Sequence, residues 1–361
     1  MKPMTRVVKF ISYIFIFAVI ILGNSLSWTQ STWASTEAPG DPCHIAIAVP
    51  KPIKQDLSAI GVASFLNWRP NRPPGVAANI EHLKPRLTAL PCDILDRQQI
   101  DAVLGRAEPD VVVHLAAQTS PALSWRDVET TFRVNLSGTL RLLDAIREAG
   151  GDPVIEVACS SAEYGFAGED ELPIKETAQL RPASPYGVSK VAVDLLSRLY
   201  WQAYAMKVVR VRPFFVIGTR KVGDVCSDFA RGVVAVETGR SQVLSVGNLE
   251  VMRDFVDVGD AVRALWLLAE RGSPGEVYNL CSGVGHRVRE VLELLIALSG
   301  NDVRWRVVPE KTRPNDVTVC VGDNLRLKAL GWKPEIPLER SLADILDFWR
   351  RAAAAGAAIG C

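Results

Sequence analysis

The chain has 361 residues and a mass of 39.4 kDa, a length that suits two domains or one large α/β unit. Apolar residues make up 48% and charged residues 22%, a balance that argues against a disordered chain, a collagen-like repeat and a multi-span membrane protein. The 41 basic and 40 acidic residues leave a formal net charge of +1, so the composition carries no basic signature of a nucleic-acid-binding protein. Any anion that binds must be held by a local site.

Residues 1–40 read differently from the rest of the chain. Lys2, Arg6 and Lys9 precede an apolar run over residues 10–22, and a small residue, Ala34, follows a polar stretch. This order is typical of a signal peptide, and the run is shorter than the about 20 residues that cross a membrane. The alternative is that the segment is an upstream extension or a mistranslated stretch.

From about residue 60, short apolar runs alternate with helical patterns. The helix predicted at 186–204 has Ser184 as N-cap and Pro185 at its first position, a combination that favours a helix start. Strands separated by helices predict right-handed crossovers and a Rossmann-like, doubly wound parallel sheet. The other predicted elements are strands at 110–115, 154–158, 207–211 and 303–308 and helices at 129–149, 260–271 and 288–299.

The cysteines and histidines give no pattern of a metal or disulfide site. The cysteines are odd in number, far apart and form no C-x-x-C pair, so we expect them to be reduced and structural. The four histidines show no H-E-x-x-H spacing, and we expect no metal site. The cysteines are Cys43, Cys92, Cys159, Cys226, Cys281, Cys320 and Cys361.

The strongest chemical pattern combines the end of a strand with the helix that follows it. Tyr186 and Lys190 are four residues apart and lie on one helix face. An ammonium group beside a phenol lowers the tyrosine pKa from its free value of about 10, which makes Tyr186 a candidate general acid or base. Ser160, at the end of the 154–158 strand, can hydrogen-bond the substrate oxygen whose charge changes.

In this context the chain resembles the extended short-chain dehydrogenase/reductase family of NAD-dependent epimerases and dehydratases. Within the family it looks most like GDP-4-keto-6-deoxy-D-mannose reductases and GDP-mannose 4,6-dehydratases. The resemblance covers about residues 60–350. Its ordered motifs include Cys92-Asp-Ile-Leu-Asp96, His114-Leu-Ala-Ala-Gln118, Asn135-Leu-Ser-Gly-Thr139, Ser160 to Gly165, Ser184-Pro-Tyr-Gly-Val-Ser-Lys190, Arg212-Pro-Phe214, Arg253-Asp-Phe255 and Arg313-Pro-Asn-Asp316.

The resemblance implies a role for each matching residue. Tyr186 would transfer the proton, Lys190 would lower its pKa and hold the nicotinamide ribose, and Ser160 would hydrogen-bond the 4-keto oxygen. The implied cofactor is NADP(H) or NAD(H). It would contact Asp93 and Ile94 at the adenine, Leu115, Ala116 and Ala117 at the pyrophosphate and ribose, and Arg69 at a 2′-phosphate, which a guanidinium group suits.

The implied substrate is a GDP-sugar, held by Arg253 and Arg313 at its diphosphate, with Ser161 and Asp316 as further contacts. Phe215 stands where the family usually carries an asparagine that contacts the nucleotide sugar. Ala162 stands where the dehydratases carry the glutamate that removes a proton from the sugar. Glu163 is adjacent, but one residue along an extended segment points to the opposite side. Ala162 therefore favours a reductase.

One expected motif is missing. A dinucleotide-binding fold needs a glycine-rich turn after its first strand, and before residue 60 the chain offers only Gly23 and Gly40. The nearest candidate for that strand is 44–49, which Pro50 and Pro52 follow without the N–H donors that a pyrophosphate needs.

These observations lead to one main hypothesis. We expect an NAD(P)H-dependent reductase that converts GDP-4-keto-6-deoxymannose to GDP-D-rhamnose. Its domains would be a dinucleotide-binding domain at 41–212, a substrate-binding lobe at 213–350 and a tail at 351–361. The alternatives are another nucleotide-sugar dehydratase or epimerase, and a non-catalytic remnant without the cofactor loop. The family implies a cytoplasmic enzyme that pairs into a homodimer through helices 129–149 and 186–204. The apolar run at 10–22 implies export or a membrane anchor instead, and we expect the catalytic domain to face the cytoplasm.

Overall fold

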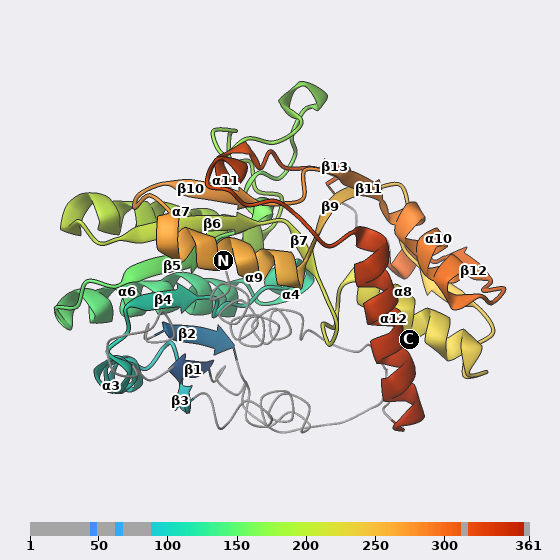
Figure 1. Ribbon diagram of the computed structural model, residues 1–361, viewed down its shortest axis with the longest axis horizontal. Coiled ribbons are helices and arrows are strands. Elements are labelled where there is room, and N and C mark those ends of the chain that lie inside the picture. The colour runs from blue at the N-terminus through green and yellow to red at the C-terminus, as the bar shows by residue number, and fades with distance from the viewer. Residues whose placement is uncertain (1–43, 49–61, 68–87, 312–316, 357–361) are drawn as a thin grey trace.

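The protein is described here from a computed structural model (Figure 1), which places residues 44–48, 62–67, 88–311 and 317–356. These residues form a large sheet with helices on both faces and a smaller lobe beside it. The predicted segment at residues 10–22 lies outside the described residues, as do Arg69, Arg313 and Asp316.

The large sheet has seven strands in the order β10-β6-β5-β4-β2-β1-β3. β4 (Val111–His114) and β5 (Val154–Ala158) lie at its centre and pair in parallel, with Val113 opposite Glu156. The other members are β1 (His44–Ala48), β2 (Val62–Asn67), β3 (Thr88–Cys92), β6 (Val208–Pro213) and β10 (Val277–Leu280). The predicted Rossmann-like α/β sheet is confirmed.

The first strand departs from the expectation. β1 lies between β2 and β3 and runs antiparallel to both, whereas β2 is parallel to β4 and takes the place beside it. At this edge β1 therefore departs from the parallel pairing of the rest of the sheet. An antiparallel neighbour needs no helical crossover, and the sequence between β1 and β2 begins with Pro50 and Pro52.

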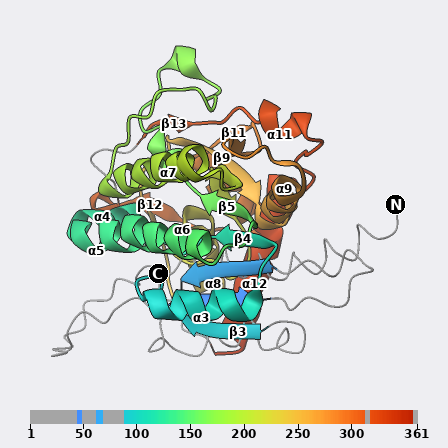
Figure 2. The ribbon, with the colours of Figure 1, turned by 90° about the vertical axis from the view of Figure 1, so that its left-hand side faces the viewer.

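Helices cover both faces of the sheet (Figure 2). α3 (Arg97–Ala107), α6 (Gly138–Glu148) and α7 (Pro185–Tyr204) pack on one face through a buried apolar cluster that includes Leu142 and Val193. α9 (Val258–Arg271) packs on the other face against alternate residues of the same strands. This two-sided burial explains why the central strands read as continuous apolar runs.

The predicted helix at 129–149 contains a local distortion. It begins as α5 (Val128–Phe132), passes through the π-helical turn η3 (Arg133–Ser137) and continues as α6. A π-turn inside a helix frequently lies at a functional site, because it displaces side chains from the regular spacing. The short helix α4 (Pro121–Arg126) precedes it.

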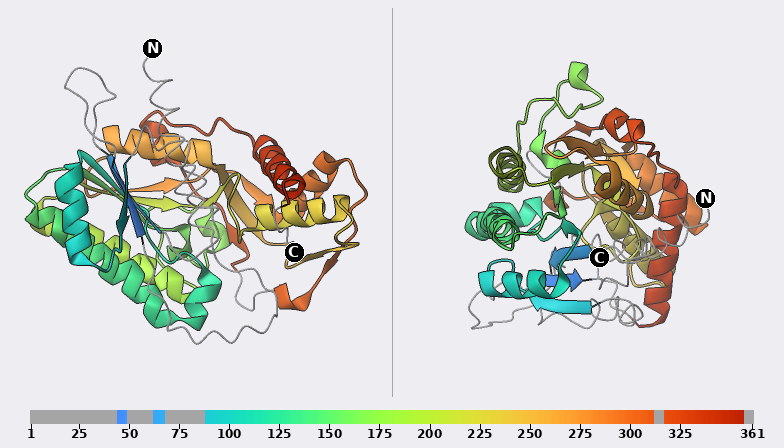
Figure 3. Two further views of the ribbon diagram at one scale, coloured as in Figure 1. Left: turned by 90° about the horizontal axis from the view of Figure 1, so that it is seen from below. Right: turned by 60° about the vertical axis from the view of Figure 1, so that its left-hand side comes forward.

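The smaller lobe lies at one end of the sheet (Figure 3). Its four-stranded sheet consists of β7 (Phe215–Ile217), β9 (Met252–Asp257), β11 (Gly285–Arg287) and β13 (Val319–Cys320). Helices α8 (Val225–Glu237), α10 (Val288–Ser299) and α12 (Leu338–Ala354) surround a separate apolar core. The strands β8 (Leu244–Val246) and β12 (Trp305–Val307) form a separate parallel pair. The short helix α11 (Leu325–Ala329) precedes α12 in the chain.

Two predicted elements and one predicted helix cap are confirmed in detail. The 154–158 and 288–299 elements have the predicted bounds, and Ser184 caps α7 with Pro185 at its first position. The five described cysteines are free and buried. Among the placed residues, no helix combines the length and the apolar character that a membrane crossing requires.

Candidate functional site

Ser160 lies at the carboxyl end of β5, where the strand turns into the 3-10 helix η4 (Ser161–Glu163). Its hydroxyl oxygen accepts a hydrogen bond from the Ala162 N–H at 3.1 Å, and its own N–H donates to Oε1 of Glu163 at 2.8 Å. This reciprocal pair is a capping box, which the spacing of a serine and a glutamate three residues later favours. The capping box holds the serine at the edge of the sheet.

Tyr186 and Lys190 face this serine from the first turns of α7. Both side chains are buried, and the Tyr186 side chain is hydrogen-bonded to that of Ser160. Nζ of Lys190 donates to the carbonyl oxygen of Ala158 at 2.7 Å. Gly187 permits this close approach, because a Cβ there would lie 2.6 Å from the Ala162 carbonyl oxygen. The structure thus brings together the three predicted catalytic residues.

The charge state of the tyrosine differs from the sequence expectation. Burial raises the pKa of Tyr186 to about 12, and the hydrogen bond from Ser160 acts in the opposite direction. The expected lowering of this pKa by Lys190 is therefore wrong for this structure, because desolvation of the phenolate dominates. Burial also lowers the pKa of Lys190, opposed by the charges of Cys159 and Glu163. Tyr186 is consequently protonated at neutral pH, the form that can donate a proton.

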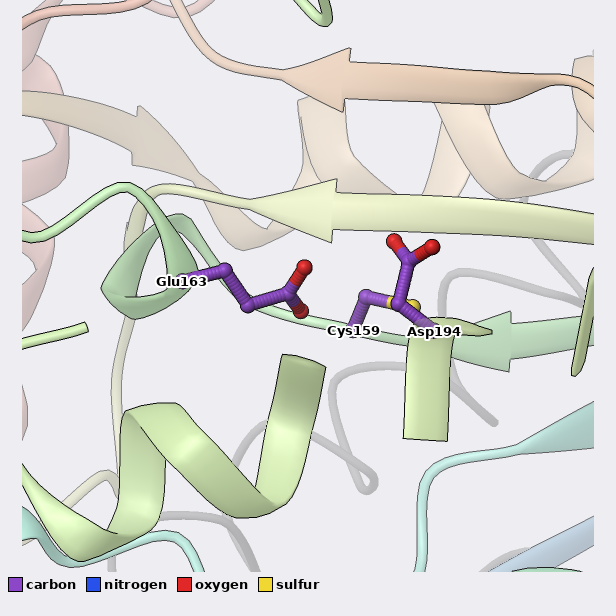
Figure 4. A group of neighbouring side chains, drawn as sticks. All are labelled: Cys159, Glu163 and Asp194. Carbon is purple, nitrogen blue, oxygen red and sulfur yellow. The ribbon is translucent and has the colours of Figure 1, made fainter. Parts of the chain in front are cut away.

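A buried ionic network lies behind Ser160 (Figure 4). Glu163 reaches from η4 toward Cys159 and Asp194, and one ligand-type atom of each lies within 4.8 Å of the others. Nε of Arg212, on β6, lies 3.0 Å from both Glu163 Oε2 and Asp194 Oδ2. Arg210 pairs with the second oxygen of Asp194. Arg212 supplies the positive charge among these carboxylates, so we assign the cluster to an ion-pair network rather than a metal centre.

Sequence reasoning missed the role of this network, although signals for it were present. Glu163 is three residues after Ser160, the capping-box spacing, and Asp194 is one helical turn after Lys190. The pairing with Arg212, however, depends on the neighbouring strand β6 and has no local signal.

Asn135 is a second residue whose position sequence reasoning did not use. It lies in the π-turn η3 and joins two parts of the site. Its amide donates to the Gln118 carbonyl oxygen at 3.0 Å and to Ser189 Oγ at 2.9 Å, and its oxygen accepts from the Gln118 N–H at 2.7 Å. Asn135 thereby ties the segment after β4 to the helix that carries Tyr186.

The predicted substrate residues gather on the side of the smaller lobe. The Phe215 ring on β7 lies under the guanidinium group of Arg253, with 5.2 Å from Cζ to the ring centroid. Cys320 is in register with Arg253 on the paired strand β13, and its thiol is hydrogen-bonded to the Ser161 side chain. Ser161, Phe215 and Arg253 therefore lie in one neighbourhood next to Ser160.

The predicted cofactor residues lie at the carboxyl ends of β3 and β4. Leu115, Ala116 and Ala117 are buried directly after β4, and the small side chains of the two alanines permit the close approach of a ligand. Asp93 lines a cavity of about 590 Å³, whereas the Ile94 side chain is fully buried in the core. The other residues that line the cavity are Leu95, Asp96, Arg97, Arg133 and Arg141. In a doubly wound sheet, dinucleotides bind outside the carboxyl ends of the strands, so these residues fit such a cofactor.

Comparison with known proteins decides the family. The model of the family described as GDP-mannose 4,6 dehydratase matches residues 71–345. The chain belongs to this family. One relative, GDP-6-deoxy-D-mannose reductase of Pseudomonas aeruginosa, is 36% identical to this chain over 244 residues. The aligned part is 67% of this chain and 80% of the relative. A GDP-mannose 4,6-dehydratase of Vibrio cholerae is 29% identical over 288 residues, 70% of this chain and 76% of the relative.

Solved structures place this GDP-mannose 4,6-dehydratase family member among extended short-chain dehydrogenases/reductases. RMD from Pseudomonas aeruginosa complexed with NADPH aligns with a TM-score of 0.68 and 34% identity over 72% of this chain and 86% of that chain. UDP-glucose 4-epimerase of Thermus thermophilus in complex with NAD aligns with a TM-score of 0.65 and 32% identity, over 72% and 83%. The protein is an oxidoreductase of an NAD(P)-dependent family.

Proposed function

We propose that this protein reduces the 4-keto group of a GDP-6-deoxyhexose, converting GDP-4-keto-6-deoxymannose to GDP-D-rhamnose. The observation that carries the proposal is the placement of carboxylates around Ser160. Glu163 turns into the interior, where it binds the Ser160 N–H and Arg212, and Ala162 carries no acid. Elimination of water from the sugar needs a base near its C5 position, whereas reduction needs a hydride and one proton donor.

Tyr186 supplies the proton in this proposal. Its raised pKa keeps the phenol protonated at neutral pH, and its hydrogen bond to Ser160 orients the hydroxyl. Ser160 hydrogen-bonds the same sugar oxygen and stabilises the charge that develops on it. Lys190, held on the Ala158 carbonyl, lies one helical turn from Tyr186 and stabilises the phenolate after the proton has left.

The reduced nicotinamide supplies the hydride when it is bound. Asp93 and the cavity beside it would hold the adenosine end, Leu115, Ala116 and Ala117 the centre, and Lys190 the nicotinamide ribose. These assignments, with Arg69 at a 2′-phosphate, follow from the family resemblance. Leu115 through Ala117 lie directly beyond β4 at the sheet edge that β5 shares, which supports a single cofactor path to Tyr186.

The GDP group would bind against the smaller lobe. Arg253 offers a guanidinium group whose plane is supported by the Phe215 ring, and Ser161 lies close to the sugar end beside Ser160. Arg313 and Asp316 belong to the same proposal. A guanidinium group pairs with a diphosphate through two parallel hydrogen bonds, the geometry that an arginine favours.

We also propose that the enzyme works as a homodimer in the cytoplasm, where nucleotide sugars and reduced nicotinamides are found. An exposed apolar face on α6 and α7 supports the dimer. Leu195 and Leu199 are each 54% exposed, and Val188 and Leu140 are exposed on the same pair of helices. Val188, Leu195 and Leu199 are spaced by seven and four residues and so share one helix face.

The test is a product analysis with purified protein. Incubation with GDP-4-keto-6-deoxymannose and NADPH or NADH should give GDP-D-rhamnose with an equal loss of reduced cofactor, and Tyr186→Phe should abolish both. GDP-mannose alone should remain unchanged. Conversion of GDP-mannose to its 4-keto product would identify a dehydratase. Binding of the nucleotide sugar with no affinity for NADPH would identify a non-catalytic remnant.

A further inference from the structure

Glu163 connects the catalytic serine to the buried ionic network, and the proposed reaction makes no use of it. Its side chain is fully buried in η4. One carboxyl oxygen accepts the Ser160 N–H at 2.8 Å, and the other lies 3.0 Å from Arg212 Nε. A single carboxyl group therefore contacts both the turn that positions Ser160 and the ion pair beneath it.

The charges around Glu163 come from every element that packs against it. The Cys159 thiol directly follows β5, the Tyr164 phenol follows η4, and β6 contributes Arg212. α7 contributes the remaining groups, which are Tyr186, Lys190 and Asp194. Arg210 joins the network through Asp194.

The ionisation of Glu163 changes the charge beside Tyr186. Arg212 contacts the carboxyl groups of both Glu163 and Asp194, and Lys190 lies one helical turn from Tyr186. When Glu163 is ionised, a phenolate on Tyr186 adds a further negative charge to the same buried region. Uncompensated charge in a protein interior is costly, so the ionisation of Glu163 changes how readily Tyr186 gives up its proton.

We propose that Glu163 is a positioning residue that holds Ser160 through its backbone N–H and, through its charge, sets the proton affinity of Tyr186. This proposal rests on the proposed reductase function for its kinetic consequence. Its structural part, the effect of Glu163 on Tyr186, stands independently of the substrate.

The direction of the electrostatic effect follows from the pKa values. Burial raises the pKa of Glu163 to about 8, with Asp194 adding to the shift and Arg212, the Ser160 hydrogen bond and Lys190 opposing it. The carboxylate form of Glu163 raises the pKa of Tyr186. Removing this charge must therefore lower the pKa of Tyr186.

The test uses Glu163→Gln and Glu163→Val in the full chain. Glutamine retains an oxygen that can accept the Ser160 N–H but cannot ionise, and valine removes both the charge and the acceptor. The matched control is Glu176→Gln. Glu176 is also buried, and its Oε1 accepts a hydrogen bond from the Asn279 backbone N–H at 2.9 Å. Its Oε2 lies 3.6 Å from Nε of Arg326. Its carboxyl group does not contact Ser160.

The first readout is the ultraviolet absorbance of the Tyr186 phenolate, taken as the difference between each protein and its Tyr186→Phe counterpart. Glu163→Gln and Glu163→Val should each lower the titration midpoint by on the order of one pH unit, and Glu176→Gln should leave it in place. A midpoint that stays within experimental error in the folded Glu163 variants overturns the proposal. If one variant does not fold, the other carries the same test.

The second readout is the pH profile of kcat/KM for ketone reduction. Its alkaline limb should move to lower pH in Glu163→Gln, because reduction needs protonated Tyr186. Glu163→Val should in addition lower kcat about tenfold or more at every pH, with a smaller change in KM, because the Ser160 turn loses its acceptor. An alkaline limb unchanged from the wild type contradicts the proposal. If the wild type does not turn over, the reductase function fails, and the phenolate titration alone decides the role of Glu163.

Discussion

The buried carboxyl group of Glu156, in the large sheet, should lower the free energy of unfolding in a pH-dependent way. This residue is 1% exposed at the centre of β5, between Val113 and Val209 on the neighbouring strands. Within the described part of the chain neither carboxyl oxygen has a hydrogen-bond partner. Burial alone raises the pKa of this carboxyl group well above 4.5. Glu156 therefore destabilises the fold at neutral pH.

The magnitude follows from the linkage between protonation and folding. Because the folded pKa is raised, stability is highest below the unfolded pKa of about 4.5 and falls as the pH rises toward the folded value. The loss from this group is about 1.4 kcal/mol for each pH unit over which only the unfolded carboxyl group is ionised. An unsatisfied buried polar group adds about 1–3 kcal/mol that does not depend on pH.

Two substitutions separate these contributions. Glu156→Gln retains the shape and cannot ionise, so its stability relative to the wild type should rise with pH and approach zero difference near pH 4.5. Glu156→Leu also removes the unsatisfied polar group and should exceed Glu156→Gln by about 1–3 kcal/mol at every pH. Urea unfolding between pH 4.5 and 7.5 measures both. A stability difference between wild type and Glu156→Gln that does not vary with pH would refute the reasoning.

Three further changes test the site and its surface. Lys190→Met removes the ammonium group that the Ala158 carbonyl holds and should lower kcat about 10²-fold or more while the thermal unfolding temperature changes little, measured by steady-state kinetics and calorimetry; an unchanged kcat would contradict its role. Phe215→Ala removes the ring under Arg253, a cation–π contact worth about 0.5–2 kcal/mol, and should raise the KM for the GDP-sugar about 2- to 30-fold with a nearly constant kcat; a loss confined to kcat would argue against this contact. Leu195→Glu places a charge on the exposed face of α7 and should give monomers by light scattering, whereas a dimer that persists would place the interface elsewhere.

Much of the fold was predictable because its signals are local. The capped start of α7 and the buried run of β5 depend on residues that are neighbours in sequence. The antiparallel placement of β1 was not predictable, since a strand's position in a sheet depends on its pairing partners and an apolar run looks the same in either direction. The π-turn at Asn135 likewise follows from its contacts with Gln118 and Ser189, which no spacing shows.

The candidate site divides in the same way. The convergence of Ser160, Tyr186 and Lys190 was predictable, because helix periodicity and strand ends place them. The pKa of Tyr186 was not, because it depends on how deeply the neighbouring elements bury the phenol. Glu163 shows which contacts a sequence can predict. Its capping role follows from its spacing after Ser160, whereas its contact with Arg212 forms only when β5 and β6 pair.

Isotope labelling tests most directly whether this protein transfers a hydride from the reduced nicotinamide to C4 of the sugar. Purified protein would be incubated with GDP-4-keto-6-deoxymannose and NADPH or NADH deuterated at the transferred position, and the product examined by mass spectrometry and NMR. We predict one deuterium at C4 of a 6-deoxyhexose, with none incorporated by Tyr186→Phe. Loss of reduced cofactor without deuterium at C4, or no incorporation by a wild-type protein that binds both ligands, would contradict it.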